Sequence, residues 1–270
     1  MSCAGHRTWD GPRTRVIGNP VNPILWHSCG MDEVAIGSAW MDTAEMARFA
    51  RMRFEKRRTE ARLGRWTAKQ TVSLARGRSR GERDLTSVVV RNAPDGAPEL
   101  FVDGVHQPTI IAMTDRADWA VTALRDGRER IGCDLELIEP RSPQFVTDYL
   151  TDHERMQVTA GDVELLANLM WSAKESSLKV LRTGLRRDTR TVEVHLDDPS
   201  AGSAGSWSPF AVLVDGGATR HHGWWIRYGE FLLTVAAEVP VGQPVALVDP
   251  PPLASAVPAH AWMDSLPPGE

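Results

Sequence analysis

Two short segments constrain this chain more than any others: I-G-C-D-L-E, ending at Glu136, and W-S-A-K-E-S-S-L-K, running from Trp171 to Lys179. The first predicts a strand, in which Asp134 and Glu136 lie two residues apart and point to one face. The second predicts a helix, in which Trp171, Glu175 and Lys179 follow at intervals of four and share a stripe. The two carboxylates of the strand, Asp134 and Glu136, and that of the helix, Glu175, make an oxygen site that suits Mg²⁺. This ion takes one or two carboxylates, waters and substrate phosphate oxygens.

Taken together, the two segments resemble the signature of the 4′-phosphopantetheinyl transferases. The two blocks of that family are roughly (I/V)-G-(I/V)-D-(I/L)-E and (F/W)-S-x-K-E-(S/A)-x-x-K. The matching residues of this chain are Gly132, Asp134, Leu135 and Glu136 in the first block, and Trp171, Ser172, Lys174, Glu175, Ser176 and Lys179 in the second. The resemblance covers roughly residues 33–240 and is to the large, surfactin-synthetase-activating type. It implies an α+β fold of two similar α/β halves in a pseudo-twofold arrangement, each a small, mostly antiparallel sheet with packed helices.

The expected organisation has four parts along the chain. An irregular, Gly-, Pro- and Arg-rich lead-in over residues 1–30 precedes an N-terminal half over 31–128, which the resemblance places on the coenzyme A side. The C-terminal half, over 129–240, holds the metal and catalytic motifs, and a Pro-rich tail follows over 241–270. The local patterns predict strands near 33–40, 85–91, 131–136, 191–196, 210–214, 224–228 and 231–237, and helices near 44–53, 55–72, 144–150, from 152, and through the W-S-A-K-E segment. The resemblance implies two further strands, one after the other, within 110–124.

Composition narrows the class of protein. The formal net charge of −4 over 270 residues gives no global basic field, so nucleic acid is not an expected partner. No apolar run is long enough to cross a bilayer, and the start lacks the apolar core of a signal peptide. Three cysteines at unrelated spacings argue against a disulfide framework or a zinc site. We therefore expect a cytoplasmic protein, and the resemblance implies a monomer.

The resemblance also implies a reaction and its participants. The family moves the 4′-phosphopantetheine arm of coenzyme A onto a serine of an acyl or peptidyl carrier protein and releases 3′,5′-ADP. On this basis Asp134, Glu136 and Glu175 would hold Mg²⁺, and Glu175 would also take the serine proton. Glu154 aligns with a second glutamate proposed for that role in part of the family. Lys179 would stabilise the departing ADP.

Further residues are expected on the coenzyme A side. Arginine grips phosphate bidentately, so the predicted contacts of the 3′-phosphate and diphosphate include several arginines. The candidate residues there are Arg58, Arg65, Arg91, Asp115, Arg116 and Lys174. Each motif also has a simpler interpretation, since a strand with two carboxylates is often a solvated face and a Glu–Lys pair four residues apart is often a surface ion pair.

Two positions depart from the family pattern. Asp115 stands where the family has a phosphate-contacting histidine, and Ala97 stands where its G-K-P turn has a lysine. An aspartate repels a neighbouring phosphate unless it is paired or protonated, and Arg116 is a candidate partner for it. Three interpretations remain open: a transferase with an altered coenzyme A pocket, a divergent enzyme on the same scaffold that acts on another substrate in a natural-product pathway, and a non-catalytic module that binds a carrier protein.

Overall fold

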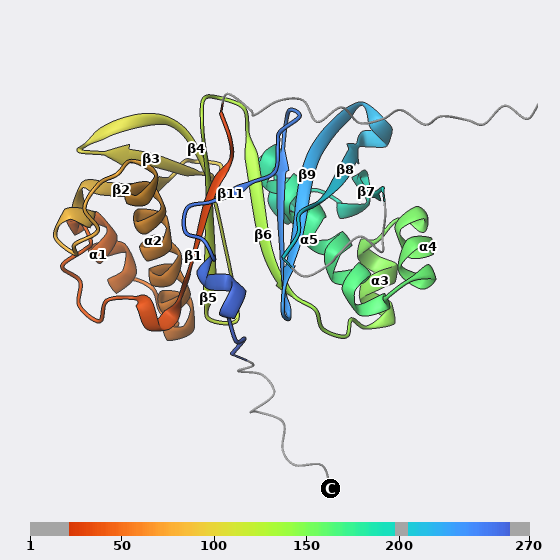
Figure 1. The fold of residues 1–270 in the computed structure, drawn as a ribbon, viewed down its shortest axis with the longest axis horizontal. Helices are drawn as coiled ribbons and strands as arrows, with labels where there is room; N and C mark the ends of the chain where they lie inside the picture. Colours follow the sequence, from red (N-terminus) through yellow and green to blue (C-terminus); the bar gives the residue numbers. More distant parts are fainter. Residues whose placement is uncertain (1–21, 198–204, 260–270) are drawn as a thin grey trace, which may run out of the picture.

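The computed structural model describes residues 22–197 and 205–259. Two sheets lie face to face in the middle of the molecule, and helices cover the outer side of each (Figure 1). The architecture is α+β with two α/β halves, as the sequence predicts. None of the helices in the described ranges is long and apolar enough to cross a membrane.

The first sheet and its helices come from the N-terminal part of the chain. A strand is followed by two helices and then by four antiparallel strands, and the last of these pairs antiparallel with the first. The elements are β1 (Leu25–Gly30), α1 (Thr43–Ala50), α2 (Glu55–Ala75), β2 (Val88–Asn92), β3 (Pro98–Val102), β4 (Val105–Arg116) and β5 (Trp119–Asp126). The sheet order is β11-β1-β5-β4-β3-β2, in which β11 (Val245–Ala246) is a short strand from near the C-terminus.

The second sheet repeats this plan. One strand, three helices and four antiparallel strands follow one another, and the last strand again pairs antiparallel with the first. The elements are β6 (Ile131–Leu137), α3 (Pro143–Tyr149), α4 (Asp152–Ala160), α5 (Val163–Leu181), β7 (Val192–Leu196), β8 (Ser208–Val214), β9 (Thr219–Tyr228) and β10 (Phe231–Ala237). The order β6-β10-β9-β8-β7 matches β1-β5-β4-β3-β2 strand for strand.

Alternation along β6 explains how the halves meet. Its odd-numbered residues, such as Cys133 and Leu135, are buried between the two sheets together with Trp26 and Val121 of the first sheet. Its even-numbered residues face α5. Among these, Gly132 permits a close approach, because a Cβ there would lie 2.0 Å from the backbone oxygen of Ser176. The fold therefore holds α5 directly against the strand that carries Asp134.

Side chains fix where the helices begin. Asp42 caps α1, accepting a hydrogen bond from the backbone N–H of Glu45, as the sequence predicts for this position or its neighbour. Thr151 and Glu154 form a capping box at the start of α4, in which the glutamate reaches back to the Thr151 N–H. Both capping glutamates are buried, which prepares the ion pairs described below.

Three local predictions are wrong. The strand expected over 33–40 is absent, and the chain there makes a 3₁₀ turn (Met31–Glu33) and bends. The first strand is β1, inside the expected lead-in, where buried polar residues hide the hydrophobic alternation. The strand expected over 85–91 begins only at Val88, after a 3₁₀ turn (Asp84–Ser87).

The Pro-rich segment is structured over much of its described length. Strand β11 pairs parallel with β1, and a 3₁₀ turn (Pro252–Ser255) follows. Leu253 of that turn is fully buried between the sheets, and its N–H donates to Ser28 Oγ. The prediction of an unstructured Pro-rich tail is wrong here. Although the segment has the composition of a loop, the pairing of β11 with β1 and the burial of Leu253 hold it in place. Residues 1–21 of the lead-in and 260–270 of the tail lie outside the described residues.

Candidate active site

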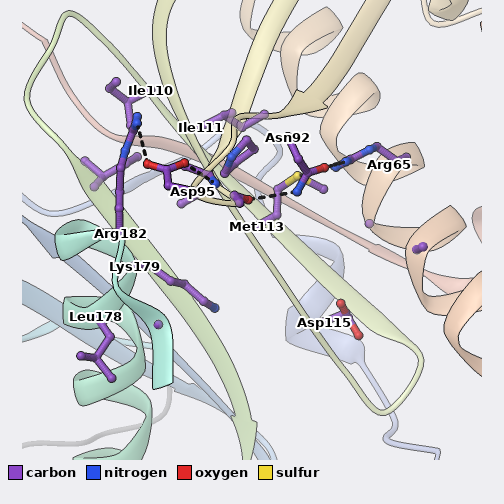
Figure 2. A pocket seen from close by; sticks show the side chains of 18 of the residues that line it. Arg65, Asn92, Asp95, Ile110, Ile111, Met113, Asp115, Leu178, Lys179 and Arg182 are labelled. Carbon is purple, nitrogen blue, oxygen red and sulfur yellow. Dashed lines mark hydrogen bonds and ion pairs between the residues drawn. The ribbon is translucent and has the colours of Figure 1, made fainter. Parts of the chain in front are cut away.

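A cleft of about 410 Å³ lies where the two halves meet. Figure 2 shows Lys179 and Arg182, from the end of α5, on one side of it, and Arg65 and Asn92 on the other. Six of the described lining residues are basic and three are acidic: Arg48, Arg65, Arg130, Lys179, Arg182 and Arg186 against Glu60, Asp95 and Asp115. Apolar residues of β4, among them Ile110 and Met113, line it as well. The cleft therefore suits an anion that also carries apolar groups.

Lys179 connects this cleft to Asp134. Its Nζ donates to Asp134 Oδ1 at 2.9 Å and to the backbone oxygen of Cys133 at 2.7 Å. Burial acts to lower the pKa of Lys179, but the carboxylates of Asp134 and Glu175 outweigh it and raise the pKa. Thr114 of β4 donates to the same Asp134 oxygen at 3.2 Å and accepts from the Leu135 N–H, so both halves position this carboxylate.

Glu175 lies one turn before Lys179 on the same face of α5. Burial raises the pKa of its carboxyl to about 7, and the charges of Asp134 and Glu136 contribute in the same direction, against Lys179. The second oxygen of Asp134, Oδ2, is buried and has no hydrogen-bond partner among the described residues. Two carboxyl groups with unused acceptor capacity thus lie next to one ammonium group.

Glu136, by contrast, is already surrounded by donors. Its Oε2 accepts from Arg141 at 3.1 Å and lies 3.4 Å from Arg116 Nε, and its Oε1 accepts from Trp171 Nε1 at 3.1 Å. Burial and Asp134 raise the pKa of Glu136, while the two guanidinium groups oppose that shift. Arg116 also pairs with Glu139, so this arginine faces the carboxylates and not Asp115.

Lys174 and Glu154 lie away from the cleft, in a fully buried ion pair. Lys174 Nζ is 2.8 Å from Glu154 Oε2 and also donates to the backbone oxygens of Thr189 and Val192. The other Glu154 oxygen accepts from the Val194 N–H. Neither residue lines the cleft. The predicted catalytic role of Glu154 and the predicted phosphate contact of Lys174 therefore lack the required geometry.

The N-terminal half contains the same ion pair. Lys69 Nζ lies 2.8 Å from Glu45 Oε2 and donates to the backbone oxygens of Trp40 and Leu85. In both halves the glutamate is the third residue of a helix and closes its capping box, and the lysine lies on the longest helix. A pair that occurs twice in equivalent places, once far from any carboxylate cluster, has a structural role.

The family assignment rests on the part of the chain that holds β6 and α5. Residues 130–234 match the family model of the 4′-phosphopantetheinyl transferase superfamily. The chain carries a domain of that superfamily. A search of curated proteins finds no match. Both motifs that carried the resemblance lie within the matched residues, and the structure brings them together at the Asp134–Lys179 ion pair.

The residues predicted to contact coenzyme A differ in where the structure places them. Arg65 lines the cleft, where its Nη2 donates to Asn92 Oδ1, and Ala97 and Asp115 line it too. Partial removal from water and the Glu60 charge raise the pKa of Asp115 to about 6, against Lys179. Arg58 and Arg91 are absent from the described lining, and the Arg91 guanidinium lies 4.6 Å from the centre of the Phe101 ring.

Four basic residues of the cleft escaped the sequence predictions: Arg48, Arg130, Arg182 and Arg186. Arg182 continues the stripe of Glu175 and Lys179 by three residues, so its spacing was a usable signal. It bridges the cleft to Asp95, with 3.4 Å between Nη1 and Oδ2. Arg130 directly precedes β6 and was equally predictable from its position beside the first motif. Arg48 comes from α1 and Arg186 from a 3₁₀ turn (Gly184–Arg186), and no local pattern marks them.

Proposed function

We propose that this protein transfers the 4′-phosphopantetheine arm of coenzyme A to a serine hydroxyl of an acyl or peptidyl carrier protein and releases 3′,5′-ADP. The observation that carries the proposal is the placement of Lys179, which lines the basic cleft and is ion-paired to Asp134 beside Glu175. A polyanion bound in the cleft at Lys179 would therefore have one end next to the carboxyl groups of Asp134 on β6 and Glu175 on α5.

The cleft supplies the binding step. Coenzyme A carries phosphate charge on an apolar and amide-containing scaffold, and the cleft combines basic side chains with apolar ones. Arg65, Arg182 and Lys179 would take the phosphates, because guanidinium and ammonium groups bind phosphate oxygens through charge-assisted hydrogen bonds. Binding of this kind weakens with salt, since the partly exposed charges are screened.

Two of the three predicted carboxylate ligands, Asp134 and Glu175, fit a magnesium ion. Asp134 Oδ2 is buried without a partner, and Glu175 has a raised carboxyl pKa, both of which a cation would relieve. No group of three or more His, Cys, Asp or Glu side chains is arranged for metal binding within residues 22–197 and 205–259. Asp134 and Glu175 would hold the ion, and Glu136 would join only by exchanging Arg141 for it. Bound Mg²⁺ would neutralise diphosphate charge.

The chemistry assigned to the side chains is proton transfer and charge stabilisation. The serine oxygen forms a bond to the phosphorus that bears pantetheine, and the bond from that phosphorus to the oxygen of the 3′,5′-ADP leaving group breaks. Glu175, one turn before Lys179 on the same face of α5, accepts the serine proton. Lys179 stabilises the negative charge that grows on the leaving phosphate.

Intact-mass spectrometry of apo carrier proteins, incubated with the protein, coenzyme A and Mg²⁺, tests the proposal. We expect a mass gain of one phosphopantetheine, lost with EDTA and in Glu175→Gln. Glu164→Gln is the matched control, because Glu164 is exposed in the first turn of the same helix. No gain on any carrier in a panel that an established family enzyme modifies would refute the proposed reaction.

A second candidate, a related enzyme with a different substrate, is favoured by Asp115 and Ala97. Both line the cleft, and together with Glu60 they leave this part of it without the expected cation. Calorimetric titration with coenzyme A and with 3′,5′-ADP separates the candidates. Tight binding of both supports the transferase, whereas binding of neither would mean that the cleft serves another anion. Carrier-protein binding without any mass gain would instead favour a non-catalytic module.

A further inference from the structure

The N-terminal half contains a counterpart of the site on α5. Residues 66–71 of α2 read W-T-A-K-Q-T, and residues 171–176 of α5 read W-S-A-K-E-S. The shared lysines are those of the two buried ion pairs, so the two segments are equivalent in space as well as in sequence. Gln70 accordingly occupies the position of Glu175, and Trp66 that of Trp171.

The strand registers extend this equivalence to β1. His27 pairs with Thr122 of β5, as Asp134 pairs with Thr234 of β10. Because side chains alternate along a strand, Cys29 then occupies the position of Glu136. The strand and helix positions that carry three carboxylates in one half therefore carry imidazole, thiol and carboxamide groups in the other.

These substituted positions line a cavity of about 260 Å³, separate from the basic cleft. Its lining consists of His27, Cys29, Glu33, Trp66, Gln70 and Arg80. His27 and Gln70 are each more than nine-tenths buried. His27 Nδ1 is buried without a hydrogen-bond partner among the described residues, although buried polar groups normally have one. The Gln70 carboxamide makes no hydrogen bond to the described part of the chain either. A polar occupant of the cavity would satisfy both groups.

The inner groups of the cavity are uncharged at neutral pH. Burial, reinforced by Arg80, lowers the pKa of His27 to about 4. Burial and Glu33 raise the pKa of the Cys29 thiol to about 12. Glu33 and Arg80 are exposed and bring one charge of each sign. A hard cation such as Mg²⁺, which needs carboxylate oxygens, has no such ligands at the strand positions.

We propose that this cavity is a second ligand site, which binds a small, planar, uncharged molecule with a lactam or carboxamide edge. The Gln70 carboxamide presents a donor and an acceptor side by side, which matches the adjacent acceptor and donor of a lactam. His27 provides a further hydrogen bond, and the Trp66 ring provides an apolar wall. The proposal does not rest on the reaction at the basic cleft, because none of these six residues lines that cleft.

Saturation-transfer NMR with 2-pyridone as the probe tests the second site. N-methyl-2-pyridone, which lacks the N–H donor, is the matched control ligand. We expect saturable binding of 2-pyridone and binding at least about tenfold weaker for the methylated probe, since it leaves the Gln70 acceptor unpaired. Coenzyme A should not displace the probe from wild-type protein.

Two variants locate the binding. Gln70→Leu keeps a helix-forming side chain of similar size, removes both hydrogen-bonding atoms and should weaken 2-pyridone binding at least about tenfold. Gln144→Leu, in exposed α3, should leave it unchanged. Circular dichroism and a melting curve show that each variant is folded. The proposal is overturned by a lack of saturable binding, by equal binding of both probes, by unchanged binding in Gln70→Leu, or by displacement with coenzyme A.

Discussion

Replacing Lys174 by methionine tests whether this lysine of the second motif supports the fold or the reaction. Methionine keeps the length of the aliphatic stem and removes the ammonium group. In the structure that group is fully buried, 2.8 Å from Glu154 and bonded to two backbone oxygens. Burial lowers the pKa of Lys174, and Glu154 acts to keep the lysine charged. The substitution therefore leaves a carboxylate and two carbonyl groups without their shared donor.

The expected loss in the free energy of unfolding follows from the number of buried acceptors that lose their donor. Removal of one partner of a buried ion pair costs about 3–5 kcal/mol, and the two carbonyl groups place this case toward the upper end. For a chain of 270 residues, 1 kcal/mol corresponds to about 2–4 °C in Tm, so Tm should fall by roughly 10 °C or more. Lys174→Met combined with Glu154→Gln should recover part of the loss, because no unpaired carboxylate then remains buried.

The assay combines urea unfolding, followed by tryptophan fluorescence, with transfer activity at a temperature where each variant is folded. Lys69→Met is the matched control, since Lys69 makes the same contacts in the other half. We expect comparable losses of stability in both variants and retained turnover in the folded fraction. A Lys174→Met protein with unchanged Tm and abolished turnover would refute the structural assignment and return Lys174 to the substrate site.

Three further predictions concern single positions. Gly132→Ala should destabilise the fold by several kcal/mol in urea unfolding, because its Cβ would meet the Ser176 oxygen at 2.0 Å, whereas Gly37→Ala, in open space, should be near neutral. Asp115→His should lower KM for coenzyme A by removing a negative charge from the cleft, and an unchanged KM would place the substrate elsewhere. In EDTA, Tm should decline as pH rises from about 4.5 to 7, since the folded protein retains the Glu175 proton that the unfolded chain releases; a Glu175→Gln protein with the same decline would contradict this.

Much of the fold was predictable because the strongest patterns are long and periodic. The helix around Lys174 and the strand around Asp134 agree with the predicted positions, as do the closing strands of the second sheet. The wrong predictions have a shared cause: tertiary contacts fix segments whose composition alone does not indicate regular structure. Strand β1 has the polar residues His27 and Ser28 in its buried middle, and the segment around Leu253 is rich in proline, yet each is fixed by contacts with residues distant in sequence.

The site was predictable in part for the same reason. Spacing along one strand and one helix placed Asp134, Glu175 and Lys179 together, and the structure pairs two of them directly. Spacing could not reveal that Glu136 faces Arg116 and Arg141, since those contacts join separate elements. Nor could it reveal that Lys174, one residue from Glu175, points into the core.

The internal repeat offers a criterion that motif matching lacks. A residue that occurs at the same place in both halves supports the fold that the halves have in common. A residue that differs between the halves can instead take part in a reaction at a site that only one half contains. Lys174 has its equal in Lys69, and the two make the same three kinds of contact. Glu175 and Lys179 correspond to Gln70 and Leu74, which cannot supply a carboxylate or an ammonium group. Within one nine-residue motif, the repeat therefore separates Lys174, which holds α5 in place, from Glu175 and Lys179. Burial separates the two lysines in the same way, since Lys174 is fully buried and Lys179 lines the cleft.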